Sequence, residues 1–69
     1  MRDQLEKLVN EMFDRGILFE DARREFERRF ISRALESSDG SLTEAASRLG
    51  IHRNTLSRKV VEYKLRGRR

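Results

Sequence analysis

The chain has 69 residues, a formal net charge of +4, no cysteine and no proline. A chain of this length forms at most one small domain, and without cysteine it has neither disulfides nor thiolate metal sites. With a single histidine, no zinc site is expected. No run of residues is apolar enough to span a bilayer, and no signal peptide is visible. We therefore expect a nearly all-helical domain with no cofactor, no metal and no membrane partner.

The charge is unevenly distributed. Residues 1–40 hold eight Arg and Lys against ten Asp and Glu, a balance of −2, whereas residues 41–69 hold eight against two, a balance of +6. A basic half joined to a mildly acidic half indicates a polyanionic partner on one side of the molecule.

The first predicted helix runs from Asp3 to Arg15. Its apolar residues recur at positions i, i+3, i+4, i+7 and i+8, which is typical of an amphipathic helix. Asp3 together with Glu6 is expected to cap its start, and Gly16 stands just past its end.

An apolar connector at residues 17–19 leads to a second predicted helix over about 20–37. No good polar N-cap stands at this junction, so the sequence does not mark where this helix begins. Ala22, Phe26, Phe30 and Ala34 form one stripe at i+4 spacing, which Ile31 and Leu35 widen. The remaining face alternates in charge, and Glu25 is spaced to pair with Arg29.

These two helices carry more large apolar residues than one antiparallel pair can hide. Each one left in water forgoes roughly 1.5–3 kcal/mol of burial. A two-fold dimer, in which two helical hairpins form a four-helix bundle, would bury both faces. The alternative is a larger parent protein whose other domain covers this surface. The predicted dimer core consists of Leu5, Leu8, Val9, Met12, Phe13, Phe26 and Phe30.

Residues 37–40 are polar and end in Asp-Gly, which predicts a turn between residues 1–40, the dimerisation helices, and residues 41–69, a helix-turn-helix unit with a basic tail. The segment SLTEAASRLGIHRNTLSRKVVEY (41–63) carries this second pattern. Ser41 is a predicted N-cap, the pair Ala45 and Ala46 allows close helix approach, and Gly50 supplies a left-handed turn. Buried aliphatic residues on the second helix complete the helix-turn-helix pattern. An ordinary helical hairpin is the alternative.

The outward face of the second helix is suited to reading bases. With Leu56 pointing inward and a turn of about 100° per residue, Asn54, Ser57, Arg58 and Val61 point outward. Arginine can bond guanine O6 and N7, and asparagine can bond adenine N6 and N7. The predicted base-reading residues are Arg53, Asn54, Ser57 and Arg58.

Other polar residues of this unit are better placed for phosphates, which position a protein without carrying sequence information. His52 precedes the second helix and can either cap it or contact a phosphate. The predicted phosphate contacts are Thr43, His52, Thr55, Lys59 and Lys64.

The segment GSLTEAASRLGIHRNTLSRKVVEY, preceded by REFERRFISRALES, resembles the Fis-type DNA-binding domain. That family includes the nucleoid protein Fis and the C-terminal domains of bacterial enhancer-binding transcription activators. The resemblance implies a homodimer that places two helix-turn-helix units in successive major grooves of double-stranded DNA, in the bacterial cytoplasm at the nucleoid. It carries the family's DNA-contacting arginine at the start of the reading helix onto Arg53, and a basic contact five residues later onto Arg58. It also carries phosphate-binding threonines onto Thr43 and Thr55, and a polar helix-entry residue onto His52.

The sequence departs from the nucleoid protein at Glu44, Ser57, Val61 and Glu62, where that protein tends to be basic. The chain is therefore closer to the regulator-type domains, and further domains of a larger activator are possible partners. A helical dimerisation or protein-interaction module with a basic face is the alternative function. An enzyme is not expected, because no acid–base pair, thiol or glycine-rich phosphate loop is present.

Overall fold

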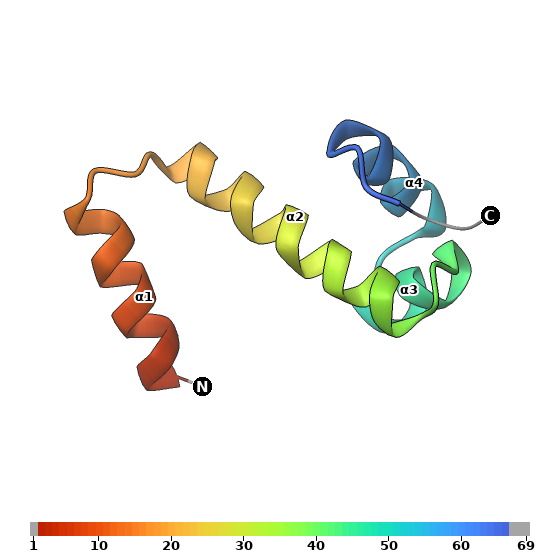
Figure 1. Ribbon diagram of the computed structural model, residues 1–69, viewed down its shortest axis with the longest axis horizontal. Helices are drawn as coiled ribbons and strands as arrows, with labels where there is room; N and C mark the ends of the chain where they lie inside the picture. The colour runs from red at the N-terminus through yellow and green to blue at the C-terminus, as the bar shows by residue number, and fades with distance from the viewer. Residues whose placement is uncertain (1, 67–69) are drawn as a thin grey trace.

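The computed structural model describes residues 2–66 and has four helices in that range, with no β-sheet among them. The chain runs through α1 (Arg2–Asp14), α2 (Phe19–Ser37), α3 (Leu42–Leu49) and α4 (Arg53–Glu62) (Figure 1). The predicted all-α class and the order of the elements are confirmed. Residues 67–69 of the predicted basic tail lie outside the described residues. None of the helices within residues 2–66 is long and apolar enough to cross a membrane.

Helix α1 begins and ends one residue earlier than predicted. Asp3 therefore lies in the first turn and not at the cap, where its carboxylate still faces the positive end of the helix dipole. The C-terminal prediction is confirmed, because Gly16 has a φ of 75° and its amide donates to the Phe13 carbonyl at 3.0 Å. The Ile17 amide donates to the Met12 carbonyl at 3.1 Å, which completes the helix stop.

Helix α2 starts at Phe19, one residue before the predicted boundary. Its N-cap residue Leu18 makes no side-chain capping bond, so only Glu20 and Asp21 in the first turn favour the positive helix end. The predicted pair is present, with Arg29 Nε 2.7 Å from Glu25 Oε1. The pKa of Glu25 is lowered, first by the hydrogen bond from Arg29 and then by that from Arg28.

The predicted Asp-Gly turn ends α2. Asp39 and Gly40 both have positive φ, and the Gly40 amide donates to the Leu35 carbonyl at 2.8 Å. Ser38 beside them is buried, and its Oγ has no hydrogen-bond partner among the described residues.

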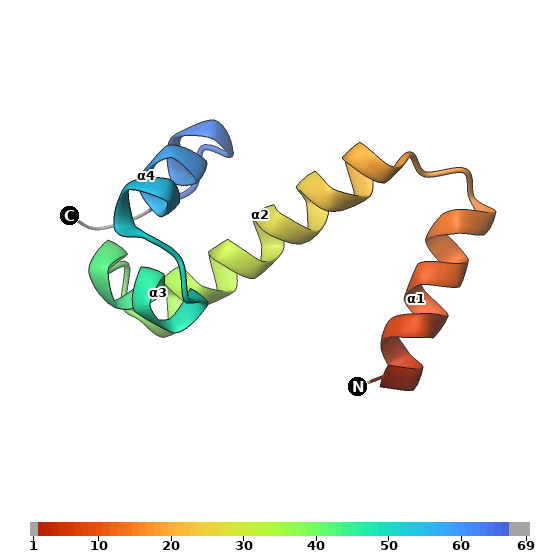
Figure 2. The same cartoon turned by 180° about the vertical axis from the view of Figure 1, so that it is seen from behind.

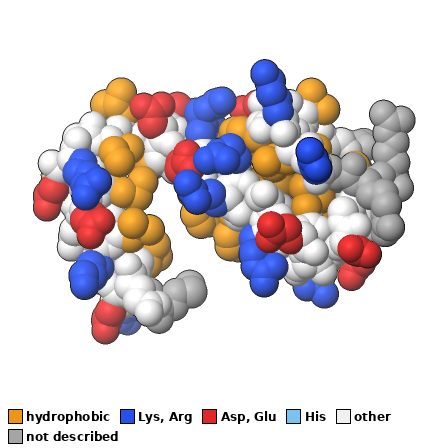
Figure 3. Space-filling model, in the orientation of Figure 1, with side chains coloured by type: hydrophobic (Ala, Val, Ile, Leu, Met, Phe, Trp, Pro, Cys, Tyr) orange, Lys and Arg blue, Asp and Glu red, His pale blue; other side chains and the backbone are white. Residues whose placement is uncertain are grey.

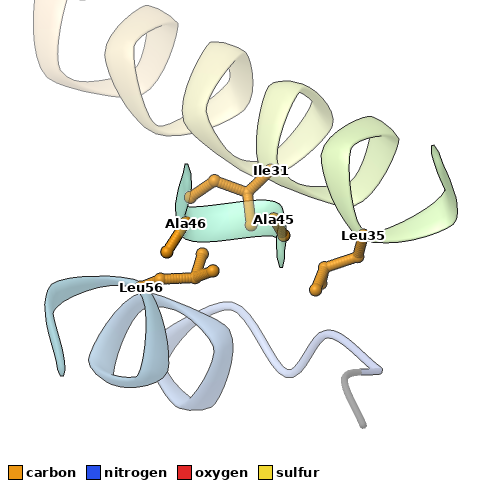
Figure 4. Close-up of a cluster of buried hydrophobic side chains, with 5 residues drawn as sticks. All are labelled: Ile31, Leu35, Ala45, Ala46 and Leu56. Atoms are coloured by element: carbon orange, nitrogen blue, oxygen red, sulfur yellow. The ribbon is translucent and has the colours of Figure 1, made fainter. Parts of the chain in front are cut away.

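The core joins the C-terminal half of α2 to both helices of the helix-turn-helix unit. Ala45 and Ala46 have no bulk beyond Cβ, so α3 lies close to α2 and α4. Leu56 of α4 is 0% exposed, and burial of such a side chain stabilises the fold by roughly 1.5–3 kcal/mol. Figure 4 shows these side chains converging from three helices: Ile31, Leu35, Ala45, Ala46 and Leu56.

Helix α1 stands apart from this core. It meets α2 at an open angle in Figures 1 and 2, and none of its described residues is buried. The principal extents of 40 × 24 × 17 Å reflect this elongated shape. The expected hairpin is therefore an open V whose apolar faces point into the space between α1 and α2.

Candidate nucleic-acid interface

The turn between α3 and α4 is built from local signals in the sequence. Ser41 Oγ accepts a hydrogen bond from the Glu44 amide at 3.3 Å, which confirms the predicted cap of α3. Gly50 ends α3 with a φ of 71° and a ψ of 30°, the left-handed conformation that glycine adopts at low cost. The Ile51 amide donates to the Ala46 carbonyl at 3.1 Å, so the chain reverses within three residues before α4 begins.

His52 caps α4. Its Nδ1 accepts a hydrogen bond from the Asn54 amide at 3.0 Å, so the capping role expected from the sequence is observed. The side chain is exposed, so its other ring nitrogen is left at the surface at the N-terminus of α4.

The predicted base-reading residues all lie on α4: Asn54 and Arg58 on the side away from Leu56, Ser57 at the flank, and Arg53 in the first turn. Arg53, Asn54 and Arg58 are exposed, whereas Ser57 is half-buried. Neither arginine takes part in a salt bridge within residues 2–66. The donors of these two exposed guanidinium groups are therefore not engaged in ion pairs within residues 2–66 and can bind an external acceptor.

The predicted phosphate contacts have different surroundings. Thr43 lies exposed in the first turn of α3, Thr55 is half-buried, and Lys64 is exposed with a φ of 55° just after α4. Lys59 points elsewhere: its Nζ donates to Glu27 Oε1 at 2.7 Å, and its side chain is 29% exposed. The structure thus separates Lys59 from the exposed cations of α4.

Sequence reasoning missed the contact between α2 and α4 to which Lys59 belongs. Glu27 also accepts a hydrogen bond from Tyr63 Oη at 3.0 Å, and Arg24 Nη1 lies 3.0 Å from Glu62 Oε2. The pKa of Glu27 is lowered, chiefly by the hydrogen bond from Lys59. Burial, followed by the hydrogen bond to Glu27, raises the pKa of Tyr63. The partners are 32 to 38 residues apart in the chain, so no local signal pairs them.

Six of the seven residues predicted to form a dimer core are exposed in the single chain. Phe13 is 80% exposed, and Phe26 stacks on Phe30 with ring centroids 5.0 Å apart while both stay exposed. A groove of about 510 Å³ runs between α1 and α2, with Leu8, Val9, Met12, Phe19 and Ala22 among its lining residues. Figure 3 shows hydrophobic side chains along the side of α1 that faces α2. Of the predicted dimer-core residues, Leu5, Leu8, Val9, Phe26 and Phe30 are 50–59% exposed, and Met12 is half-buried.

These features define a helix-turn-helix domain: a close-packed alanine pair, a left-handed glycine turn and a second helix with a buried aliphatic face and a cationic open face. Comparison with protein families matches residues 22–63 to the family described as "Bacterial regulatory protein, Fis family". The match covers more than half of the chain, so the chain belongs to the Fis family. It is a DNA-binding domain of the transcription-regulator type. Comparisons with curated proteins and with solved structures gave no significant match.

Proposed function

We propose that this domain reads a specific double-stranded DNA sequence as a homodimer and regulates transcription in the bacterial cytoplasm. The observation that carries the proposal is that Arg53 and Arg58 of α4 are exposed and unpaired within residues 2–66, while Leu56 of the same helix is fully buried. A helix held by its inner face and cationic on its outer face can enter a major groove without rearranging the core.

The contacts divide into two classes. Asn54, Ser57 and Arg58 are assigned to base edges because they point outward from α4, and Arg53 because it is exposed in the first turn, whose residues enter the major groove in this motif. The phosphate contacts assigned to the rim are Thr43, His52, Thr55 and Lys64. Helix N-termini attract phosphates, and the capped starts of α3 and α4 carry Thr43 and His52.

Dimerisation supplies the second half of the site. The V between α1 and α2 exposes Leu5, Leu8, Val9, Phe13 and Phe26, which a soluble monomer rarely leaves uncovered as one patch. A second copy brings an identical patch, and a two-fold axis makes the two surfaces self-complementary. The pair of α4 helices would then face one duplex.

Selection of binding sites from a random duplex pool tests this function, followed by gel shifts over a range of salt concentrations. We expect a pseudo-palindromic site and an affinity that falls steeply with salt. Arg53→Ala and Arg58→Ala should each lose roughly 1–3 kcal/mol of discrimination between the selected and a random duplex. Arg15→Ala removes the same charge just after α1 and should leave that discrimination intact.

Two results would count against the proposal. If micromolar protein shifts no duplex at low salt, the basic half serves a protein partner. If both α4 arginine variants discriminate as well as the parent chain, the assignment of base-reading residues is wrong.

A further inference from the structure

Polar contacts join α4 to α2, and one carboxylate accepts two of these hydrogen bonds. Glu27 Oε1 accepts from Lys59 Nζ at 2.7 Å and from Tyr63 Oη at 3.0 Å, while Oε2 is paired with Arg23 of its own helix. Arg23 is in turn held by Glu20. Glu27 of α2 therefore binds both Lys59 of α4 and Tyr63, the residue that follows α4, which are one helical turn apart.

A second contact lies beside the first. Arg24 Nη1 is 3.0 Å from Glu62 Oε2, and its guanidinium lies over the Tyr63 ring, 5.4 Å from the centroid. Tyr63 is thus held at its hydroxyl by Glu27 and at its face by Arg24. Both contacts involve the C-terminal end of α4 and the residue after it, whereas Arg53 lies at the N-terminal end of that helix.

Lys59 and Glu27 form a partly buried ion pair between α4 and α2. The side chains of Glu27 and Lys59 are 21% and 29% exposed. Both line a cleft of about 220 Å³ whose other walls are apolar, formed by Phe26, Phe30, Ile31, Leu49 and Ile51. Moving the ammonium to a phosphate would break the 2.7 Å hydrogen bond between Lys59 and Glu27 and leave that partly buried carboxylate with Arg23 as its partner cation.

From these contacts we infer that Glu27 is a positioning residue for DNA reading. It sets the orientation of α4 on α2 through Lys59 and Tyr63, and Lys59 supports α4 without contacting a phosphate. The inference rests on the proposed function and refines it. Base readout by arginine needs two hydrogen bonds at fixed geometry, so a small rotation of α4 affects specific binding more than non-specific phosphate attraction.

Four variants separate positioning from phosphate contact: Lys59→Met, Glu27→Gln, the double variant Glu27→Gln/Lys59→Met, and Lys64→Met as a comparator that removes the same charge from an exposed site. For each, the affinity for the selected site and for random duplex is measured across salt concentrations. We expect Lys64→Met to lower the salt slope by about 1 and Lys59→Met to leave it unchanged.

The ratio of specific to random affinity gives the second readout. Lys59→Met and Glu27→Gln should each lower it by roughly threefold to thirtyfold. The double variant should lower this ratio no more than the more affected single variant does, since both changes act on the same contact between Lys59 and Glu27. Tyr63→Phe, which removes only the hydroxyl, should lower the ratio in the same direction. If circular dichroism shows that Glu27→Gln has lost helix, Tyr63→Phe takes its place in the test.

A fall in salt slope for Lys59→Met equal to that for Lys64→Met would show that Lys59 does contact a phosphate and would overturn the inference. An unchanged affinity ratio in Glu27→Gln and Tyr63→Phe would also overturn it. If the parent chain itself binds no duplex, the proposed function fails, and the inference fails with it. These outcomes are distinguished by the parent chain alone.

Discussion

Ser38 places a hydroxyl in the interior of the fold. The residue is 2% exposed, and its Oγ finds no acceptor or donor within the described residues. A buried polar atom without a partner costs about 1–3 kcal/mol. Ser38→Ala should therefore raise the free energy of unfolding by about 1 kcal/mol, measured by urea denaturation.

Ser37 is the matched control, because it is exposed and its Oγ accepts a hydrogen bond from Arg48 at 3.1 Å. Ser37→Ala should change the free energy of unfolding by less than about 0.5 kcal/mol. A loss of stability in Ser38→Ala would mean that the Ser38 hydroxyl is hydrogen-bonded in solution.

Tyr63 reports on the Glu27 contact without DNA, since it is the only tyrosine of the chain. Burial, and then its hydrogen bond to Glu27, raises the pKa of Tyr63 above its ordinary value of 10.0. Glu27→Gln removes the negative acceptor, so the pKa of Tyr63 should move back toward 10.0, measured by ultraviolet titration of the phenolate. Glu44→Gln on α3 removes an equal charge elsewhere and should leave the titration as in the parent.

The contact between Glu27 and Tyr63 also predicts how the free energy of unfolding depends on pH, in the acidic range and in the alkaline range. The pKa of Glu27 lies below its ordinary 4.5, so its contribution is complete above that value and is lost as the pH falls through the lowered pKa. The pKa of Tyr63 is raised, so its contribution is complete below 10.0 and is lost as the pH rises through the raised pKa. A parent chain whose tyrosine titrates no higher than in Glu27→Gln would contradict the contact.

At the scale of elements, α4 has one face in the core and one in water. Leu56 is 0% exposed and Val61 is 77% exposed on the same helix. Leu56→Ala should cost about 2–5 kcal/mol, from lost burial and the cavity left behind, whereas Val61→Ala should cost less than about 0.5 kcal/mol.

For a domain this small, the Leu56 loss is comparable to the whole stability. Thermal unfolding followed by circular dichroism should therefore show a helix-turn-helix unit largely unfolded at room temperature in Leu56→Ala. Equal melting curves for the Leu56 and Val61 variants would mean that α4 packs on the core through another face.

The elements that could be predicted from sequence are those with local signals. The Ser41 cap, the alanine pair and Gly50 each act within a few residues, and all are found where the sequence placed them. The start of α2 was off by one residue because Leu18 offers no capping group, so nothing in the sequence marked it. The start of α1 was also misplaced, because an acidic residue is favourable both at a cap and in the first turn.

Tertiary partners were harder to predict than elements. Periodicity placed Phe26, Phe30, Ile31 and Leu35 on one broad apolar face, but the structure divides that face. Ile31 and Leu35 pack against α3, whereas Phe26 and Phe30 stay exposed. Periodicity shows that a face is apolar and not what covers it. For the same reason the contact between Lys59 and Glu27 was not foreseen, since its two partners lie on different helices.

At the scale of the whole molecule, the chain separates two surfaces. The V of α1 and α2 carries exposed apolar residues at one end, and the exposed arginines of α4 lie on the helix-turn-helix unit at the other. Under the proposed function, the first surface joins two copies and the second contacts DNA. Damage to the apolar surface should therefore weaken DNA binding without touching any DNA contact.

Leu8→Glu tests this separation. Leu8 is 53% exposed and lines the groove between α1 and α2, so in a dimer its carboxylate replacement would be buried without a partner. We expect sedimentation to show the parent as a dimer and Leu8→Glu as a monomer. Affinity for the full selected site should fall to that for a single half-site, whereas the thermal stability of the helix-turn-helix core should change little, because α1 does not pack on it.

Asn10→Glu is the matched control, because it adds the same charge to the polar face of the same helix. It should remain dimeric and bind the full site as the parent does, apart from a small uniform loss from the added negative charge. If both variants weaken DNA binding equally while both remain dimeric, the charge acts directly on DNA and α1 is no part of the interface. If the parent itself sediments as a monomer and still binds the palindromic site tightly, then two chains meet only on the duplex, and the exposed face of α1 must serve another partner.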